Sequence, residues 1–248
     1  MRVFATYNIK GGVGKTATAV NLAYLAARDG ARTLIWDLDP QAAATFYFRI
    51  RAKVKGGAKK LLKGKRPLDA TIRGTDFEGL DLLPADFTYR NMDLDLVRSK
   101  RPTQQLASLL LPLSLQYDYQ FLYCAPSISL VSESVFVATD FLLVPTIPTT
   151  LSLRTLDQLD QYLQERGATR PRILPFLCMV DRRKSLHKRI CAGGIEHHPD
   201  MLETIIPYSS LVEQMGLHRA PLAEFAPTAE PARAYEDLWA EIVNRISL

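Results

Sequence analysis

The sequence has little cysteine and no long uninterrupted apolar segment. Its 248 residues include three cysteines, Cys124, Cys178 and Cys191, and none of them forms a C-x-x-C pair. An odd number of isolated cysteines indicates neither a disulfide framework nor a structural zinc site, and is typical of a reducing cytosol. The most apolar run, "SVFVATDFLLVPTIP", is broken by one aspartate and two prolines, and the first twelve residues lack the apolar core of a signal peptide. We therefore expect a cytoplasmic protein with no membrane-spanning segment.

Length and composition predict one large α/β domain rather than two small ones. The chain is 47% hydrophobic, which suits a substantial core in a single domain spanning residues 1–248. No internal repeat and no linker rich in proline, glycine or serine divides it. The formal net charge is +5. A positive excess of this size is compatible with binding to a polyanion, but it is also common on ordinary soluble proteins.

Short apolar runs alternate with helical patterns along the chain. The runs are "RVFATYN", "RTLIWD", "GLDLLP", "YQFLYCAP", "DFLLVPT", "RILPFLCMV" and "LETIIP". This alternation predicts βαβ units and a mainly parallel, twisted sheet with helices on both faces. The clearest helix spans Thr16 to Asp29 and stops at Gly30. The last helix, from about Ala232 to Ile246, has one broad apolar stripe, and its thin basic border favours docking on the sheet over a membrane surface.

A glycine-rich segment, "KGGVGKT", lies between the first predicted strand and the first predicted helix. Its three glycines let the backbone turn tightly, so that successive N–H groups and the amino end of the helix form a cradle for phosphate oxygens. Lys15 supplies a cation for the β and γ phosphates, and the Thr16 hydroxyl is placed to bind Mg²⁺. The strict G-x-x-x-x-G-K-[ST] pattern is missed at its first glycine, where this chain has Ile9. The alternative, a purely structural glycine turn, does not explain the strand and helix that flank the segment.

With a lysine at its start, the segment resembles the deviant Walker A motif of the ParA/MinD family of dimeric ATPases, and is most similar to the short ParA type. The likeness continues through "LIWDLDPQAAAT", "LDLLPAD", "VPTIPTTLSL", "FLCMVDRRKSLHK" and "IIPYSSLVEQMGLHRAPLAEFAPTAEPARAYEDL", and so covers most of the chain. It implies that Lys10 reaches across a nucleotide-sandwich homodimer to the partner's phosphates. ATP and Mg²⁺ are the implied cofactors, and the implied nucleotide-binding residues are Lys10, Gly11, Gly12, Val13, Gly14, Lys15, Thr16 and Ala17.

Two aspartates, Asp37 and Asp39, end the second predicted strand, where a parallel α/β sheet presents its ligand crevice. A lone D-x-D is a weak signal because strand ends often carry aspartates that cap turns. Next to a phosphate loop it is more informative. The resemblance implies that Asp39 orients the attacking water and that Asp37 helps to hold the magnesium shell. In-line phosphoryl transfer needs such positioning and charge compensation more than covalent help.

One position departs from the family. The strand "YQFLYCAP" ends at Tyr123, where the family usually has an aspartate. A phenol is neutral at pH 7, so it offers a hydrogen bond to a magnesium-bound water but no compensating charge. Loss of such an outer-shell group typically costs about ten- to a hundredfold, which predicts slow ATP hydrolysis. The alternative is that the aspartate is dispensable and that Asp37 does its work.

The adenine contacts follow only from the resemblance. It implies that Asp181 accepts a hydrogen bond from the adenine amino group, while Met179 and Pro207 pack against the faces of the base. The other interpretation is that these three are ordinary loop residues.

Two clusters of basic residues are candidates for DNA binding. The segment 49–67 holds nine Lys or Arg and no acidic residue, and a second cluster follows the predicted strand "RILPFLCMV". Charge runs are usually solvated faces, and aromatic residues suited to base stacking are few here. This density nevertheless favours contacts with the phosphate backbone that are independent of DNA sequence and sensitive to salt. The candidate residues are Lys53, Lys55, Lys59, Lys60, Arg182, Arg183 and Lys184.

Two functions are compatible with the sequence. The first is a positioning ATPase on the nucleoid: ATP closes a dimer, the dimer binds DNA, and a ParB-like or cargo-adaptor protein stimulates hydrolysis. The second is a nucleotide-dependent binding module in which Tyr123 leaves little or no hydrolysis. A MinD-like membrane role is disfavoured, because no basic amphipathic tail follows the last helix. A synthetase or a metal-cluster carrier of similar fold would need a substrate signature or paired cysteines, and the sequence has neither.

Overall fold

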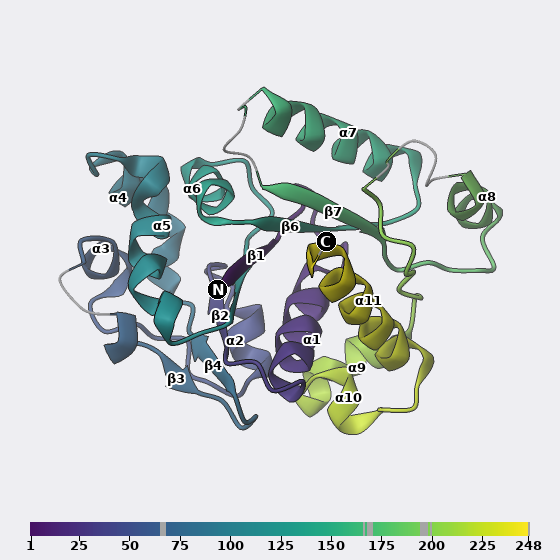
Figure 1. Cartoon of the computed structure of the whole chain (residues 1–248), viewed down its shortest axis with the longest axis horizontal. Coiled ribbons are helices and arrows are strands. Elements are labelled where there is room, and N and C mark those ends of the chain that lie inside the picture. Colours follow the sequence, from purple (N-terminus) through teal and green to yellow (C-terminus); the bar gives the residue numbers. More distant parts are fainter. Residues whose placement is uncertain (65–67, 166, 168–170, 194–197, 199, 248) are drawn as a thin grey trace.

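A seven-stranded sheet runs through the centre of the molecule (Figure 1). The structure is a computed structural model, and it describes residues 1–64, 68–165, 167, 171–193, 198 and 200–247. The strand order is β3-β4-β2-β5-β1-β6-β7. All neighbouring strands are parallel except β3 and β4, which are antiparallel. The strands are β1 (Arg2–Thr6), β2 (Thr33–Asp37), β3 (Arg73–Gly74), β4 (Leu80–Leu83), β5 (Tyr119–Tyr123), β6 (Phe141–Thr146) and β7 (Arg172–Leu177). The predicted fold class, α/β with a mainly parallel sheet, is confirmed.

Helices cover both faces of the sheet, as Figure 1 shows. One apolar core lies between the sheet and α3 (Gly57–Leu62), α4 (Met92–Val97), α5 (Gln105–Leu110), α6 (Leu130–Ala138) and α7 (Thr150–Gln164). The opposite core lies under α1 (Lys15–Arg28), α2 (Ala43–Tyr47), α9 (Ser210–His218), α10 (Leu222–Phe225) and α11 (Glu230–Ser247). The remaining elements among the described residues are α8 (Ser185–Gly193) and four short 3₁₀ turns: η1 (Leu68–Ala70), η2 (Phe87–Asn91), η3 (Pro102–Gln104) and η4 (Leu111–Leu115).

Successive side chains of each strand pack alternately into these two cores. In β1, Val3 and Ala5 belong to one core and Phe4 belongs to the other, and all three are almost fully buried. Successive side chains of a strand point to opposite faces, so a sheet covered on both faces needs apolar residues at every position. This explains why the strands read as continuous apolar runs rather than as alternating ones.

The two helices predicted most clearly are confirmed within two residues at each end. The chain leaves α1 through Gly30, whose φ of 93° is costly for other residues. On α11, Leu238, Trp239 and Ile242 are buried against the sheet, and each such side chain contributes about 1.5–3 kcal/mol of apolar burial. The Trp239 indole N–H also donates to Asp29 Oδ2 at 3.0 Å, which joins the end of α1 to α11. The apolar stripe on α11 is therefore a docking face for the sheet.

One predicted strand was wrong. Residues 202–207 form only an isolated bridge, between Val180 and Pro207, instead of a strand. The N–H groups of Leu202 and Ile206 still donate to carbonyls of β7, at 2.8 and 2.9 Å. Between them, the N–H groups of Glu203 and Thr204 donate instead to the Glu241 carboxylate of α11, at 2.7 and 2.9 Å, which interrupts the ladder. The seventh strand is instead β3, two residues long at the other edge of the sheet, which the apolar runs did not indicate.

No helix among the described residues is long and apolar enough to cross a membrane.

Candidate functional site

The carboxyl ends of the three central strands meet at one edge of the sheet. In the parallel register, Tyr123 at the end of β5 pairs with Thr6 of β1 on one side and with Asp37 of β2 on the other. The loops that leave β1 and β2 therefore start side by side, with Tyr123 between them. This edge is where open parallel sheets place their ligands.

The loop from β1 to α1 is held by side chains and by glycine conformation. Asn8, which is buried, donates to the carbonyl of Pro145 near the end of β6 and accepts from the N–H of Lys10, both at 2.9 Å. Gly12 and Gly14 have positive φ, 70° and 92°. A Cβ on Gly14 would also lie 2.7 Å from Cys178 Sγ, so neither the conformation nor the space admits a side chain there. The loop is thus fixed before any ligand arrives.

Lys15 is a buried cation at the first turn of α1. Its side chain is 5% exposed, and burial lowers its pKa to about 8. Its Nζ donates to the Lys10 carbonyl at 2.8 Å. Within the described part of the chain, no carboxylate lies within ion-pair distance of it. A cation withdrawn from water without a counter-ion favours an anionic ligand, which is what the phosphate-loop prediction requires. Val13 and Ala17, beside the cradle, are buried.

Tyr123 links the residue at the end of the phosphate loop to the second aspartate. Its hydroxyl lies 2.8 Å from Thr16 Oγ1 and donates to Asp39 Oδ2 at 3.3 Å. Tyr123 is 4% exposed, and burial raises the pKa of its phenol further above the usual value. It is therefore a neutral hydrogen-bonding group at neutral pH. Where the family usually has an aspartate, the Tyr123 hydroxyl therefore connects Thr16 to Asp39 through hydrogen bonds.

Asp37 does not face this site directly. Its side chain is fully buried, and its Oδ2 accepts from the N–H and hydroxyl of Thr45 at 2.8 and 2.7 Å. Its Oδ1 accepts from the N–H of Asp39 at 3.1 Å. Burial raises the pKa of Asp37 to about 7, although these hydrogen bonds counteract the rise. In this structure Asp37 fixes the turn that carries Asp39, and its part in holding the magnesium shell stays a prediction.

A cavity of about 360 Å³ opens beside the loop. Asp39, Met179 and Pro207 line it, together with the glycines of the loop, Lys15, Thr16 and Tyr123. Met179 has a positive φ of 56°, uncommon for a residue with a side chain. Asp181 does not line the cavity. The Arg183 guanidinium binds both of its carboxylate oxygens at 2.9 Å and holds its pKa below the usual range, and its contact with adenine stays a prediction.

Lys10 points away from the cavity. Its side chain is exposed, and its Nζ donates to Ser152 Oγ on α7 at 3.3 Å. The Lys10 side chain therefore does not extend toward the phosphate cradle beside Lys15 of the same chain. This placement leaves the cross-dimer role of Lys10 a prediction.

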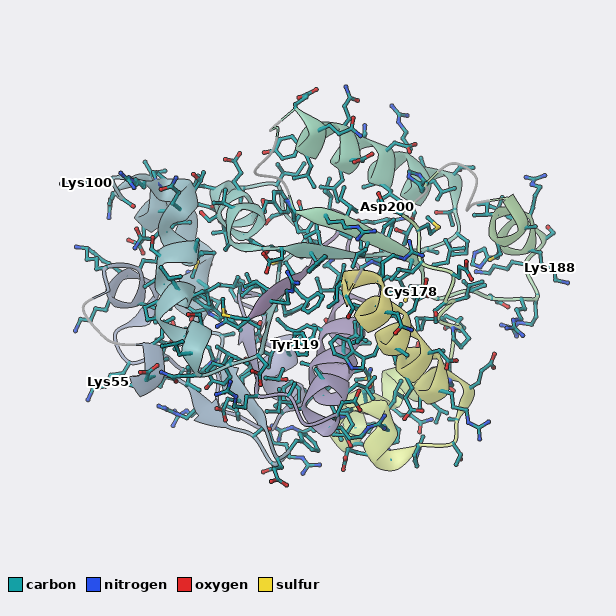
Figure 2. All side chains as sticks on the ribbon, in the orientation of Figure 1. Lys55, Lys100, Tyr119, Cys178, Lys188 and Asp200 are labelled. Carbon is teal, nitrogen blue, oxygen red and sulfur yellow. The ribbon has the colours of Figure 1, made fainter. Side chains whose placement is uncertain are left out.

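The two basic clusters lie on opposite sides of the molecule. Figure 2 places Lys55, close to α3, and Lys188, on α8, at opposite edges of the view. The predicted DNA-binding side chains of both clusters are exposed, namely Lys53, Lys55, Lys59, Lys60, Arg182, Arg183 and Lys184. Residues 65–67 of the first run lie outside the described residues. The structure therefore does not join the two clusters into one continuous surface on a single chain.

Several residues of the cavity were missed by sequence reasoning. Those from the carboxy-terminal half are Ile206, Tyr208, Ser209, Val212, Glu213 and Tyr235, and those from earlier segments are Tyr47, Pro126 and Cys178. The apolar run "LETIIP" and the "YS" that follows it gave a signal for the first three of these, because they come after Met179 and were expected on the crevice side. Tyr235 had no signal of its own, because it lies within the apolar stripe of α11.

Comparisons with known proteins agree with this geometry. A family model described as "AAA domain" matches residues 1–172. The chromosome partitioning protein ParA of Caulobacter vibrioides is 30% identical, over 99% of this chain and 95% of that protein. The sporulation initiation inhibitor protein Soj of Bacillus subtilis is 29% identical, over 97% of this chain and 98% of that protein.

Solved structures share the fold. An ATP complex of Cyanothece McdA has a TM-score of 0.86 at 23% identity, over 98% of this chain and 96% of that chain. Cobyrinic acid a,c-diamide synthase from Mycobacterium smegmatis, with a bound ATP analogue and magnesium, has a TM-score of 0.82 at 23% identity, over 100% and 96% of the two chains. At such identities the likeness concerns the fold alone.

Proposed function

The chain belongs to the ParA/MinD family of deviant Walker A ATPases, and we propose that it is an ATP-dependent switch that positions or partitions a cargo. In this proposal ATP closes a homodimer, the dimer binds DNA without sequence preference, and hydrolysis opens it again. The observation that carries the proposal is Lys15, a buried cation without a carboxylate partner, set in a glycine cradle at the mouth of a cavity.

ATP fits the residues of the cavity. The Gly11–Gly14 backbone and the two uncommitted protons of the Lys15 ammonium group suit phosphate oxygens. Met179 and Pro207 offer apolar surface for the base. No cluster of three or more His, Cys, Asp or Glu side chains that could hold a metal ion occurs in the described ranges. Mg²⁺ is therefore expected to bind through Thr16 together with phosphate oxygens, where it would compensate phosphate charge.

Asp39 is the residue best placed to orient a water for attack on the terminal phosphate. It lines the cavity, and two hydrogen bonds fix its carboxylate, one from the N–H of Gln41 at 2.9 Å and one from Tyr123. A fixed carboxylate keeps lone pairs for a water without reorganising, which is the form of help that phosphoryl transfer needs. We expect slow turnover, because Tyr123 supplies no charge.

The remaining parts of the proposal rest on the family and on surface charge. Lys10 is exposed and is the residue that would reach a partner's phosphates. A ParB-like or cargo-adaptor protein would stimulate hydrolysis, and the exposed basic clusters would hold the dimer on the nucleoid in the cytoplasm. Residues 1–248 would act together as one ATPase domain.

A second candidate function is a nucleotide-dependent binding module with little or no hydrolysis. The Tyr123 hydroxyl favours it, because it donates to Asp39 Oδ2 and lies within hydrogen-bond distance of Thr16 Oγ1 but adds no negative charge to the site.

Sedimentation of the full chain with Mg²⁺ and a non-hydrolysable ATP analogue tests the switch. We expect a dimer with the analogue, a monomer with ADP, and a monomer in both states for Lys10→Ala. Arg154→Ala, which removes a cation from α7 outside the cavity, is the matched control and should still dimerise. A chain that has the same mass in both nucleotide states would contradict the proposed switch.

A further inference from the structure

A groove between α3 and the turn that joins α4 to η3 collects positive charge far from the ATP cavity. It has a volume of about 550 Å³ and is lined by five cations: Lys59, Lys63, Arg98, Lys100 and Arg101. In Figure 2, Lys100 and Lys55 lie on the same side of the molecule, away from Cys178, which lines the ATP cavity. We call this feature the α3–α4 groove.

Little negative charge opposes these cations. Asp95 is the acidic residue among the lining side chains; it is 16% exposed and lies 3.9 Å from Arg98. Within the described residues no carboxylate lies within ion-pair distance of Lys59, Lys63 or Lys100. Like charges gathered at close range repel one another, so the groove is more favourable when an anion lies in it.

Both walls of the groove are held in place. On α3, Ala58, Leu61 and Leu62 are buried in the core, which fixes the side from which Lys59 and Lys63 project. On the other wall, Gln105 joins the two sides: its Nε2 donates to the Leu62 carbonyl at 2.6 Å, and its Oε1 accepts from the Ser99 hydroxyl at 2.9 Å. The spacing of the cations is thus set by the fold before a ligand binds, which reduces the ordering cost of binding.

We propose that the α3–α4 groove binds the phosphate backbone of duplex DNA. The charges are spread along an open groove, and no aromatic side chain lines it to stack on a base, which suits backbone contact rather than base readout. The inference rests on the proposed DNA binding and deepens it: it joins Lys59 and Lys63 of the basic run to Arg98, Lys100 and Arg101, which lie outside that run.

The test compares two variants that each lose three positive charges. One is Arg98→Gln with Lys100→Gln and Arg101→Gln, in the groove. The comparison variant is Arg182→Gln with Arg183→Gln and Lys184→Gln, in the second basic cluster. The affinity of the full chain for two unrelated DNA duplexes is measured by fluorescence anisotropy, with Mg²⁺ and a non-hydrolysable ATP analogue present. The salt concentration is varied from about 50 to about 200 mM, a range over which phosphate contacts change the affinity strongly.

We expect the groove variant to lose about tenfold or more in affinity for both duplexes. Its slope of log affinity against log salt should become shallower by up to about three, since each phosphate contact contributes about 0.9. This outcome supports the groove whether or not the Arg182, Arg183 and Lys184 variant also loses affinity for DNA. Gln105→Met, which removes both hydrogen bonds across the groove and keeps every charge, should weaken binding by about three- to tenfold with little change in slope.

Three results would overturn the inference, and they differ in what else they overturn. A parent chain that binds DNA and a groove variant with the same affinity and slope would exclude the groove alone. A loss of affinity confined to the Arg182, Arg183 and Lys184 variant would place the DNA contact near α8 instead of in the groove. A parent that binds no DNA in any nucleotide state would remove the proposed DNA binding as well. If the groove variant then loses affinity for poly-glutamate, the groove binds an acidic protein segment instead.

Discussion

Replacement of Tyr123 by aspartate restores the side chain that the family usually has at the end of β5. Compared with replacement by phenylalanine, it distinguishes the effect of a negative charge from the effect of losing the hydroxyl's hydrogen bonds. In the parent, a neutral phenol connects Thr16 to Asp39. Tyr123→Asp places a carboxylate close to Asp39, while Tyr123→Phe keeps the ring and removes the hydroxyl. The first variant should raise basal ATP turnover by about ten- to a hundredfold and strengthen its dependence on Mg²⁺. The second should not.

The cost in stability follows from burial. Tyr123 is 4% exposed within the apolar core under α1, so loss of the ring costs about 2–4 kcal/mol. The new carboxylate also repels Asp39 when no cation is present. We expect a fall in melting temperature of roughly 5–12 °C for a chain of this size. Tyr123→Phe loses about 1–2 kcal/mol, because only the hydrogen bonds are removed.

Two measurements check this prediction together. Melting temperature without ligand, with ATP, and with ATP and Mg²⁺ reports whether Mg²⁺ stabilises Tyr123→Asp more than the parent, independently of turnover. A phosphate-release assay gives the rate. If Tyr123→Phe raises turnover as much as Tyr123→Asp does, the hydroxyl restrains Asp39 and charge is not the reason. If neither variant changes turnover or Mg²⁺ dependence, Tyr123 is a tolerated substitution.

Other substitutions test the remaining parts of the site. Lys15→Ala should abolish ATP binding, because the phosphates lose their buried counter-ion, and calorimetric titration with ATP would reveal any residual affinity. Lys10→Ala should bind ATP with parental affinity in the same titration, since its side chain lies outside the cavity, and should fail only in dimerisation. Asp39→Ala should keep ATP bound in a dimer that remains on DNA; parental turnover in this variant would show that another residue orients the water. Gly14→Ala should destabilise the chain by about 1–3 kcal/mol, because the methyl group would meet Cys178 Sγ at positive φ; unchanged thermal unfolding would contradict that strain.

Much of the fold was predictable because it depends on local pattern. The six parallel strands read as apolar runs, and "KGGVGKT" with the preceding strand and the following helix located the phosphate loop. The segment 202–207 has the same apolar pattern, yet it is not a strand, because the Glu241 carboxylate takes the N–H groups of Glu203 and Thr204 and so interrupts the ladder with β7. That competition comes from α11, far along the chain, and no local pattern contains it.

The sequence predicted several residues of the site, but not the hydrogen bonds that connect them. Sequence alone placed Asp37 and Asp39 together, and only the structure separates them: Asp37 is bound by Thr45 beneath the turn, while Asp39 lines the cavity. Likewise, the bond from Tyr123 to Thr16 joins residues 107 positions apart. The Arg183 pair that holds Asp181 depends on side-chain geometry, which residue type does not specify.

The most direct test of the central claim is ATP turnover by the full chain with Mg²⁺, measured with and without duplex DNA and with Lys15→Ala as the background control. The account predicts slow hydrolysis by the parent that changes when DNA is added, and none by the control. Turnover equal to that of Lys15→Ala under both conditions would contradict an ATPase switch and leave the nucleotide-dependent binding module.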